Sequence, residues 1–270
     1  MNHLIAAEWL KQSRQRALLF WGFAAVPLFV TLVAFALETV TPGALHSQLG
    51  VGLHPIRSAM RAVGIAGNPM AQLFFAVGAA AIFGVEYRHS AWRHVVPRAG
   101  RTPLVAAKFG VFALLALGSL LLAAGGDLLA SLLPALARGI PVADAPPATL
   151  WHLACAFLVS LLELLTLGGA VALMAVLTRS TLGAILPPFL LSFLAAGAES
   201  LCLPSGDQLA RIPLPTFAAD AVRSWIWAQP EEPGASAGAA AFATFVLLAW
   251  AAGTFAATAL AFNRQDLGAE

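Results

Sequence analysis

The sequence predicts an all-α membrane protein that crosses the bilayer six times, and two observations predict it. The first is composition: 60% of the 270 residues are hydrophobic and only 10% are charged, whereas soluble domains carry about 25% charged residues. The second is the presence of six separate apolar runs, each near the ~20 residues that a spanning helix needs. A surface so poor in charge would not stay dispersed in water, so we expect one transmembrane domain over residues 1–270 and no separate soluble domain.

The six predicted spans share high hydropathy and a length close to the thickness of the bilayer. They are residues 17–37, 69–85, 104–133, 150–177, 182–198 and 239–262. The third run is longer than the bilayer requires, and Lys108 and Asp127 bracket its hydrocarbon part. Pro187 and Pro188 are expected to kink or break the fifth helix, because proline removes a backbone donor and clashes with the preceding turn.

Residues 4–16 predict an amphipathic helix ahead of the first span. Ile5, Ala6, Trp9, Leu10 and Ser13 fall on one arc, and Glu8, Lys11, Gln12 and Gln15 fall on the other. Such a helix would lie in the headgroup region and lead into the first span. The alternative is that it only extends the first span into the cytoplasm. The apolar run that follows is too long for the core of a secretory signal, so we expect it to remain as a span.

The distribution of Lys and Arg predicts that both termini are cytoplasmic. With the N-terminus inside, the inner segments hold ten of the fifteen basic residues, and basic residues concentrate on the cytoplasmic side of membrane proteins. The five basic residues assigned to the outer segments are Arg57, Arg61, Arg138, Arg211 and Arg223.

Glu163 is the most unusual residue inside a predicted span, because it lies near the middle of the fourth one. An ionised carboxylate is costly there and by default suggests function. It could bind a cationic group of a transported compound or relay protons. The alternative is a hydrogen-bonded glutamate buried between helices and helped by Ser160 or Thr166. Asp127 is closer to the outer boundary and is interpreted as an interfacial cap.

Several classes of function are disfavoured. A P-loop needs G-x-x-x-x-G-K-[ST], and neither of the two lysines, Lys11 and Lys108, has that context. Residues 234–238 match G-x-S-x-G, but no strand precedes them and no histidine follows them, so we interpret Ser236 as the N-cap of the sixth helix. We therefore expect a chain without enzymatic activity of its own.

The sequence gives little indication of a metal site, a disulfide or a nucleic-acid partner. There is no C-x-x-C or H-E-x-x-H motif, so no metal site is expected. Cys155 and Cys202 are either ordinary small residues or a disulfide on the outer side. The net charge is only +2 and the basic residues are spread along the chain, which argues against a nucleic-acid partner.

The segment between the second and third spans, residues 86–101, is short, strongly basic and contains Tyr and Trp. The tendency of basic residues to lie inside explains its positive charge. It does not explain Glu86 at the membrane exit or the interleaved Tyr87 and Trp92. A docking surface for a cytoplasmic partner explains both.

These residues resemble a motif of the membrane subunits of ABC exporters of the ABC-2 type. In that family the second helix exits as an E-Y-R-like motif, followed by a G-T-[LW]-R-like turn, an arginine and a lysine that opens the third helix. The matching positions are Glu86, Tyr87, Arg88, Trp92, Arg93, Pro97, Arg101 and Lys108. The chain departs from the pattern at Ser90 and Ala91, where Gly-Thr is usual. The lead-in at residues 7–11 and the ending at residues 262–266 are also similar.

The resemblance implies a permease subunit driven by a separate cytoplasmic P-loop ATPase. It makes residues 1–16 a connecting helix and places a coupling helix in residues 86–101. The ATPase-coupling residues would be Glu86, Tyr87, Arg88, Trp92, Arg93, Arg98, Arg101 and Lys108. No cofactor would bind this chain, because ATP and Mg would sit on the partner. The location would be a bacterial cytoplasmic membrane.

The resemblance also implies a second permease chain, either identical or a sibling, to complete the substrate pathway. Residues 199–238 would re-enter the membrane edge as short helices. A stripe of small residues on the sixth helix, Ala249, Gly253, Ala257 and Ala261, either packs within the chain or forms a dimer seam. The expected cargo is a drug, an antimicrobial peptide or another amphipathic compound. The alternative function is a proton-coupled secondary transporter that uses Glu163.

Overall fold

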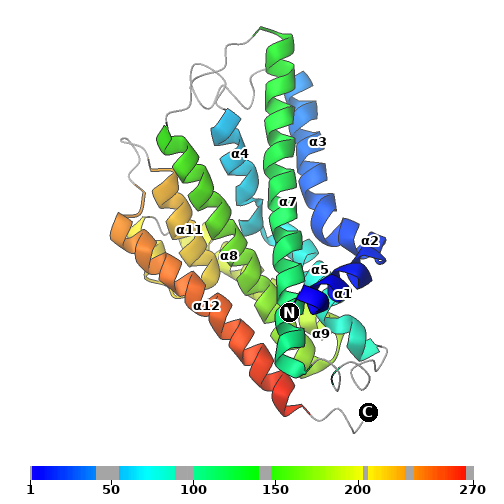
Figure 1. Cartoon of the computed structure of the whole chain (residues 1–270). Helices are drawn as coiled ribbons and strands as arrows, with labels where there is room; N and C mark the ends of the chain where they lie inside the picture. The colour runs from blue at the N-terminus through cyan, green and yellow to red at the C-terminus, as the bar shows by residue number, and fades with distance from the viewer. Residues whose placement is uncertain are drawn as a thin grey trace.

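The computed structural model describes residues 2–40, 55–88, 96, 100–139, 147–202, 206–228 and 234–265. Every regular element in these ranges is a helix (Figure 1). In chain order they are α1 (Asn2–Ser13), α2 (Arg16–Leu19), the π-helical η1 (Phe20–Ala24), α3 (Ala25–Val40), α4 (Pro55–Val63), the 3₁₀ helix η2 (Gly64–Gly67), α5 (Pro69–Arg88), α7 (Arg101–Ala137), α8 (Pro147–Thr178), α9 (Thr181–Cys202), α10 (Asp207–Ala210), α11 (Pro215–Ile226) and α12 (Ala237–Arg264).

Six stretches of helix in the described part of the chain are long and apolar enough to cross a membrane. They are Arg16–Val40, Pro69–Tyr87, Arg101–Ala137, Thr149–Thr178, Thr181–Leu201 and Ala237–Arg264. Each covers one predicted span, so the six-span prediction is confirmed. Large apolar side chains point outward from these helices, including Phe29 at 67% and Phe245 at 66% exposure. The chain is therefore a multi-pass membrane protein.

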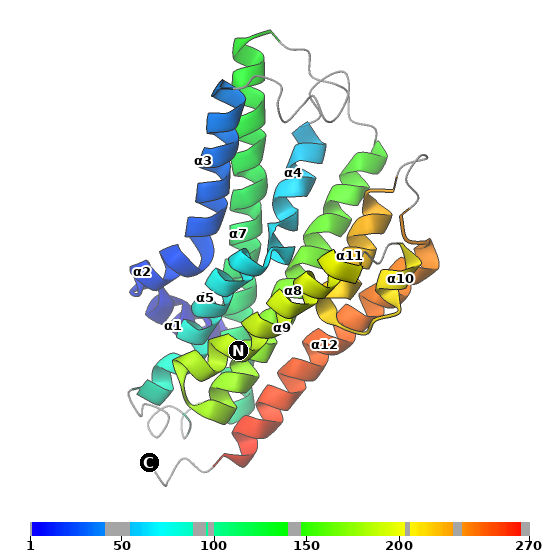
Figure 2. The ribbon, with the colours of Figure 1, turned by 180° about the vertical axis from the view of Figure 1, so that it is seen from behind.

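Two pairs of long helices run side by side, α7 with α3 and α8 with α12, and the second pair is inclined to the first (Figures 1 and 2). One apolar core lies between α5, α7 and α8 and contains Phe75, Phe112 and Leu164, none more than 1% exposed. A second lies between α8, α11 and α12 and contains Phe217 and Leu247. Because both cores are apolar, buried polar side chains are confined to a few positions in the described structure.

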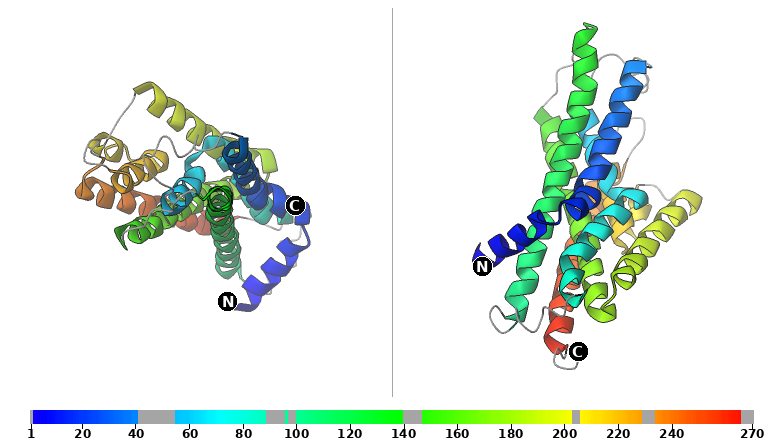
Figure 3. Two further views of the ribbon diagram at one scale, coloured as in Figure 1. Left: turned by 90° about the horizontal axis from the view of Figure 1, so that it is seen from above. Right: turned by 90° about the vertical axis from the view of Figure 1, so that its right-hand side faces the viewer.

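The N-terminal helix α1 is separate from the first span. It ends at Ser13, and the chain changes direction before α2 begins at Arg16 (Figure 3). In this structure the segment does not prolong the first span as one continuous helix. Farther along, η1 crosses α5 at a glycine pair. A Cβ on Gly22 would lie 2.6 Å from the Gly78 Cα, so only glycine permits this close crossing.

The two prolines of the fifth span do not break it. Pro187 and Pro188 lie inside α9, which is helical without interruption from Thr181 to Cys202. Of the two predicted outcomes, a kink or a break, the break is therefore wrong, because helices in a membrane tolerate proline where local adjustments re-satisfy the freed backbone groups.

The connection between α9 and α12 returns into the bundle as α10 and α11. Phe217 and Ala219 of α11 are buried at 4% and 0% exposure. Just before α11, the Pro213 carbonyl accepts a hydrogen bond of 2.8 Å from the indole Nε1 of Trp250. Trp250 lies roughly 20 Å along the α12 axis from Ala237. The turn before α11 therefore lies deep beside α12 rather than at the end of the bundle.

Ser236 begins α12 as predicted. It is the N-cap residue, and its Oγ accepts a hydrogen bond of 3.2 Å from the backbone N–H of Ala239. The Ser236 backbone N–H in turn donates to the Asp207 carboxylate over 2.6 Å. Hydrogen bonds from Ser236 hold the pKa of Asp207 below its usual value. This contact fastens α10 to the start of α12.

Candidate functional site

Apart from Glu38 of α3, which is also buried, charged side chains form buried clusters at two places in the described structure. The first lies where the predicted coupling motif meets the bundle. Lys108 of α7 is only 1% exposed. Its ammonium donates to the Glu86 carboxylate and the Ile82 carbonyl at 2.6 Å each, and to the Glu8 carboxylate at 3.1 Å. Lys11 also pairs with Glu86. We call Glu8, Lys11, Glu86 and Lys108 the exit cluster.

The helix α1 reaches the exit cluster with its polar face. Glu8 and Gln12 are buried, at 7% and 2% exposure, while Trp9 and Leu10 are 46% and 56% exposed. A helix at the surface of a soluble protein would instead bury its apolar arc and expose its polar arc. The outward apolar arc suits contact with lipid, where charged groups must turn toward the protein.

The exit cluster contains two carboxylates and two ammonium groups, so its formal charges cancel. This balance matters because removing one partner of a buried ion pair leaves an uncompensated charge and costs several kcal/mol. The cluster joins α1, α5 and α7 at one end of the bundle. It therefore fixes the position of α1 relative to the two helices that flank residues 89–99.

Two further motif residues bind other elements at this end. Arg101 Nη1 donates to the carbonyls of Phe262, Asn263 and Gln265 over 2.6–2.8 Å, and so caps the end of α12. The Tyr87 hydroxyl lies 2.8 Å from the Gln265 side-chain amide, and that amide lies 2.7 Å from Arg179 Nε in the turn between α8 and α9.

The structure thus brings together four of the eight predicted coupling residues: Glu86, Tyr87, Arg101 and Lys108. All four make contacts within the chain, and Lys108 and Glu86 are too deeply buried to touch a partner directly. Trp92, Arg93, Arg98 and the side chain of Arg88 lie outside the described residues.

The second place is the pair formed by Glu163 and Arg223. Glu163 is 3% exposed and lies at the middle of the candidate span Thr149–Thr178. Its carboxylate binds the guanidinium of Arg223 from α11 and accepts a 2.9 Å hydrogen bond from Gln72 Nε2 of α5. Arg223 also binds Asp220 at 2.8 Å. We call Glu163, Arg223, Asp220 and Gln72 the mid-span cluster.

The mid-span cluster favours the interpretation of Glu163 as a bonded glutamate between helices, but with different partners from those expected. The Thr166 hydroxyl donates to the Leu162 carbonyl at 2.9 Å, and Ser160 Oγ has no hydrogen-bond partner in the described structure. Sequence reasoning missed Arg223, which it assigned to the outer segments. It lies 60 residues from Glu163, so no local pattern connects them.

Gly67 makes room for the Arg223 guanidinium. A Cβ on Gly67 would lie 2.5 Å from Arg223 Nη1, whereas a Cβ on Gly64, in the same short helix, would meet nothing within 4 Å. The guanidinium is held on both sides by Glu163 and Asp220, so it cannot move aside without weakening an ion pair.

Two other predictions about single residues need correction or refinement. Asp127 is not a helix cap, because it lies inside α7 and accepts a hydrogen bond from Ser58 of α4. Cys155 is a free thiol, so the disulfide alternative is not formed; the side chain of Cys202 lies outside the described residues. Over the described ranges no group of His, Cys, Asp and Glu side chains could hold a metal ion.

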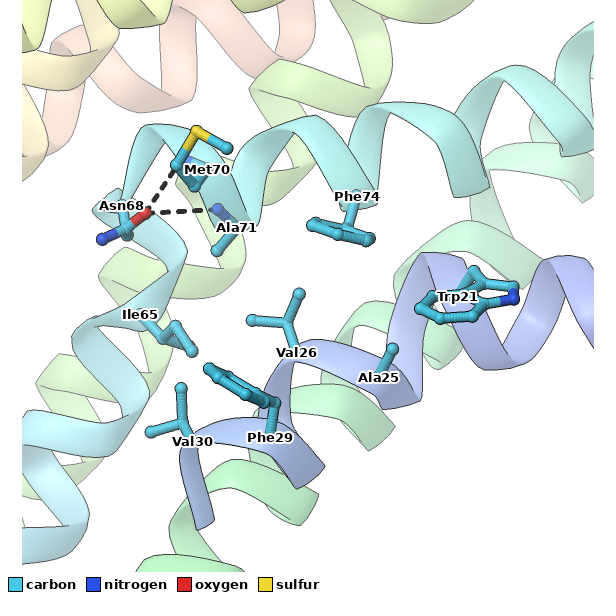
Figure 4. A pocket seen from close by; sticks show the side chains of 10 residues that line it. All are labelled: Trp21, Ala25, Val26, Phe29, Val30, Ile65, Asn68, Met70, Ala71 and Phe74. Carbon is cyan, nitrogen blue, oxygen red and sulfur yellow. Dashed lines mark hydrogen bonds between the residues drawn. The ribbon is translucent and has the colours of Figure 1, made fainter. Parts of the chain in front are cut away.

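An apolar pocket of about 460 Å³ opens between α3, α5 and η2 (Figure 4). The rings of Trp21, Phe29 and Phe74 line it. Its polar member, Asn68, accepts hydrogen bonds from the backbone N–H groups of Met70 and Ala71 at the start of α5. The pocket wall therefore offers an apolar surface suited to an acyl or aromatic group.

Comparison with known proteins adds no relative. No family model, no curated protein and no solved structure matches this chain.

Replacing Lys108 by Met is expected to lower the free energy of unfolding by about 3–5 kcal/mol, because Glu8 and Glu86 then share only Lys11. Lys11→Met is the matched control; its side chain is 32% exposed, so the expected loss is about 1 kcal/mol or less. Unfolding in detergent, followed by circular dichroism, measures both. Equal losses would contradict the buried role of Lys108.

Gly67→Ala is expected to destabilise the protein by about 1–3 kcal/mol, since the new methyl group must displace the Arg223 guanidinium. Gly64→Ala should stay within about 1 kcal/mol of wild type, because its methyl group meets open space. The same unfolding measurement compares the two variants. A harmless Gly67→Ala would show that the guanidinium is not held where the mid-span cluster places it.

Proposed function

We propose that this chain is the membrane subunit of an ATP-driven exporter of the ABC-2 type. It would work beside a second permease chain and take its energy from separate cytoplasmic ATPase subunits that carry ATP and Mg. Both termini would be cytoplasmic in a bacterial inner membrane. The observation that carries the proposal is the gathering of Glu86, Tyr87, Arg101 and Lys108 around the two ends of residues 89–99.

That gathering supports a mechanical role for residues 86–101. A force applied there would reach α1 through the exit cluster, α12 through Arg101, and the α8–α9 turn through Tyr87 and Gln265. Ion pairs and short hydrogen bonds transmit displacement better than a flexible arm would. In this proposal α1 is the connecting helix, and closure of the ATPase pair moves the helix ends together.

Two further features support the proposal. The helices α10 and α11 return into the bundle between the last two spans, as short re-entering helices would. The first half of the small-residue stripe of α12 also faces outward: Ala249 and Gly253 are exposed, and a Cβ on Gly253 would meet nothing within 4 Å, whereas Ala261 packs against Phe262 and its buried neighbours. No helix in the described part of the chain covers Ala249 and Gly253, which leaves this surface open to a second chain.

The proton-coupled alternative depends on Glu163, and the mid-span cluster disfavours it. A proton site should offer a carboxylate that can gain and lose its counter-charge during transport. Glu163 is instead bound to Arg223 and Gln72 inside the chain. The apolar pocket between α3 and α5 favours an amphipathic cargo, such as a drug or an antimicrobial peptide.

A pull-down tests the proposal. The tagged chain is extracted in detergent as wild type, as Arg93→Ala and as Arg264→Ala, and copurifying ATPase activity is measured. We expect a P-loop ATPase with wild type and with Arg264→Ala, whose side chain is exposed at the same end of the bundle. Arg93→Ala should reduce it about tenfold, as loss of one docking contact of about 1.4 kcal/mol would.

The yield and unfolding midpoint of both variants are compared with those of wild type, so that loss of the ATPase is scored only for a chain that folds. Equal recovery of the ATPase with all three chains would place the docking surface elsewhere. A chain that purifies alone and transports in response to a proton gradient would refute the ATP-driven proposal and favour a secondary transporter.

A further inference from the structure

A cavity with polar groups in its lining lies beside the mid-span cluster, between α4, α8 and α11. Its volume is about 190 Å³, and its polar lining comes from Arg61, Ser160 and Arg223. Glu163 does not line it; that carboxylate borders a smaller cavity of about 40 Å³ with Pro188 and Ser192. Arg61 and Arg223 thus line one cavity, and Glu163 lines another.

Three buried polar atoms of this cavity lack a hydrogen-bond partner in the described structure: Arg61 Nε, Ser160 Oγ and Arg223 Nε. Ser160 is 1% exposed, so bulk water does not reach its hydroxyl. Buried polar groups are nearly always bonded, and an unpaired one costs about 1–3 kcal/mol. Three such groups around one cavity indicate a missing acceptor.

The donors without partners indicate what kind of acceptor is missing. Arg223 donates through Nη1 to Asp220 and through Nη2 to Glu163. Its Nε has no partner and remains as a donor for the cavity. Arg61 makes no ion pair with any side chain that the structure describes. A guanidinium without an ion pair, a second guanidinium N–H donor and a hydroxyl suit a ligand rich in acceptor oxygens, and an oxyanion offers such oxygens together with the ion pair that Arg61 lacks.

We propose that this cavity binds an oxyanion, namely the phosphate or carboxylate group of a ligand, held by Arg61, Ser160 and Arg223. The volume equals that of about six water molecules, enough for such a group and part of what it is attached to. The group can belong to a phospholipid that enters from the side or to a water-soluble compound. The proposal does not depend on the exporter function, since it concerns only groups of this chain.

The test uses the purified full-length chain in detergent. Its thermal unfolding midpoint is measured in sodium phosphate and in sodium chloride at equal ionic strength. Phosphate should raise the midpoint of wild type, because a ligand that binds the folded state stabilises it. Arg61→Gln should weaken the apparent affinity about tenfold to a hundredfold, as expected for loss of a charged hydrogen bond.

Two further variants separate binding from general charge effects. Arg57→Gln removes an exposed arginine from the same helix α4 and should keep the full response to phosphate. Gly64→Val keeps every charge but places a side chain in the cavity that Gly64 lines, and it should abolish the response. Arg61 has no partner to lose, so Arg61→Gln is expected to fold normally.

Lipid extracted from the purified proteins identifies the source of the oxyanion. If a phospholipid occupies the cavity, mass spectrometry should find it retained by wild type and Arg57→Gln and lost from Arg61→Gln and Gly64→Val. If the natural ligand is water-soluble, no lipid should differ among the variants and the response to phosphate should appear in wild type.

Two results would overturn the proposal. If wild type neither responds to phosphate nor retains a phospholipid, water satisfies the three donors. If Arg57→Gln loses the response as fully as Arg61→Gln, phosphate acts on surface charge and not in the cavity.

Discussion

A charge inside hydrocarbon has to be neutralised within the protein, and this constraint organises the structure. Glu163 at mid-span requires a cation, and the cation is delivered by α11. To deliver it, the chain between α9 and α12 must return into the bundle, where its own backbone needs partners; the bond from Trp250 to the Pro213 carbonyl supplies one. At the other charged place, Lys108 requires carboxylates, and α1 folds back to supply Glu8. The two irregular parts of the fold are therefore consequences of two buried charges.

The two clusters divide the molecule into regions with different roles. The exit cluster and Arg101 join four elements, α1, α5, α7 and α12, at the end that holds residues 86–101. The mid-span cluster holds α5, α8 and α11 together, and its Arg223 also lines the oxyanion cavity. Between the clusters, glycine crossings such as Gly22–Gly78 bring helices together without polar contacts. A displacement imposed at the exit end would therefore reach the middle of the bundle through α5, which contributes a residue to each cluster.

The sequence predicts those structural features that depend on residues close together in the chain. The spans follow from runs of apolar side chains, and the N-cap at Ser236 follows from a serine placed before an apolar run. Contacts between distant segments leave no such pattern. From the sequence, Arg223 is assigned to an outer segment, but α11 places it against Glu163. Lys108 is predicted to be a docking residue, but its side chain is buried. The prolines of α9 mislead for a different reason, because the rule for water-exposed helices is too strict inside a membrane.

A double-mutant cycle on Glu163→Gln and Arg223→Gln tests most directly the claim that buried charge pairing organises this bundle. Glu163→Gln keeps the native shape and Arg223→Gln keeps a polar side chain, and the free energy of unfolding is measured by SDS titration from mixed micelles. If the pair organises the bundle, each single variant is strongly destabilised and the double variant recovers part of the loss, with a coupling of about 1–3 kcal/mol. Additive losses would show that the two side chains act independently, which contradicts the account.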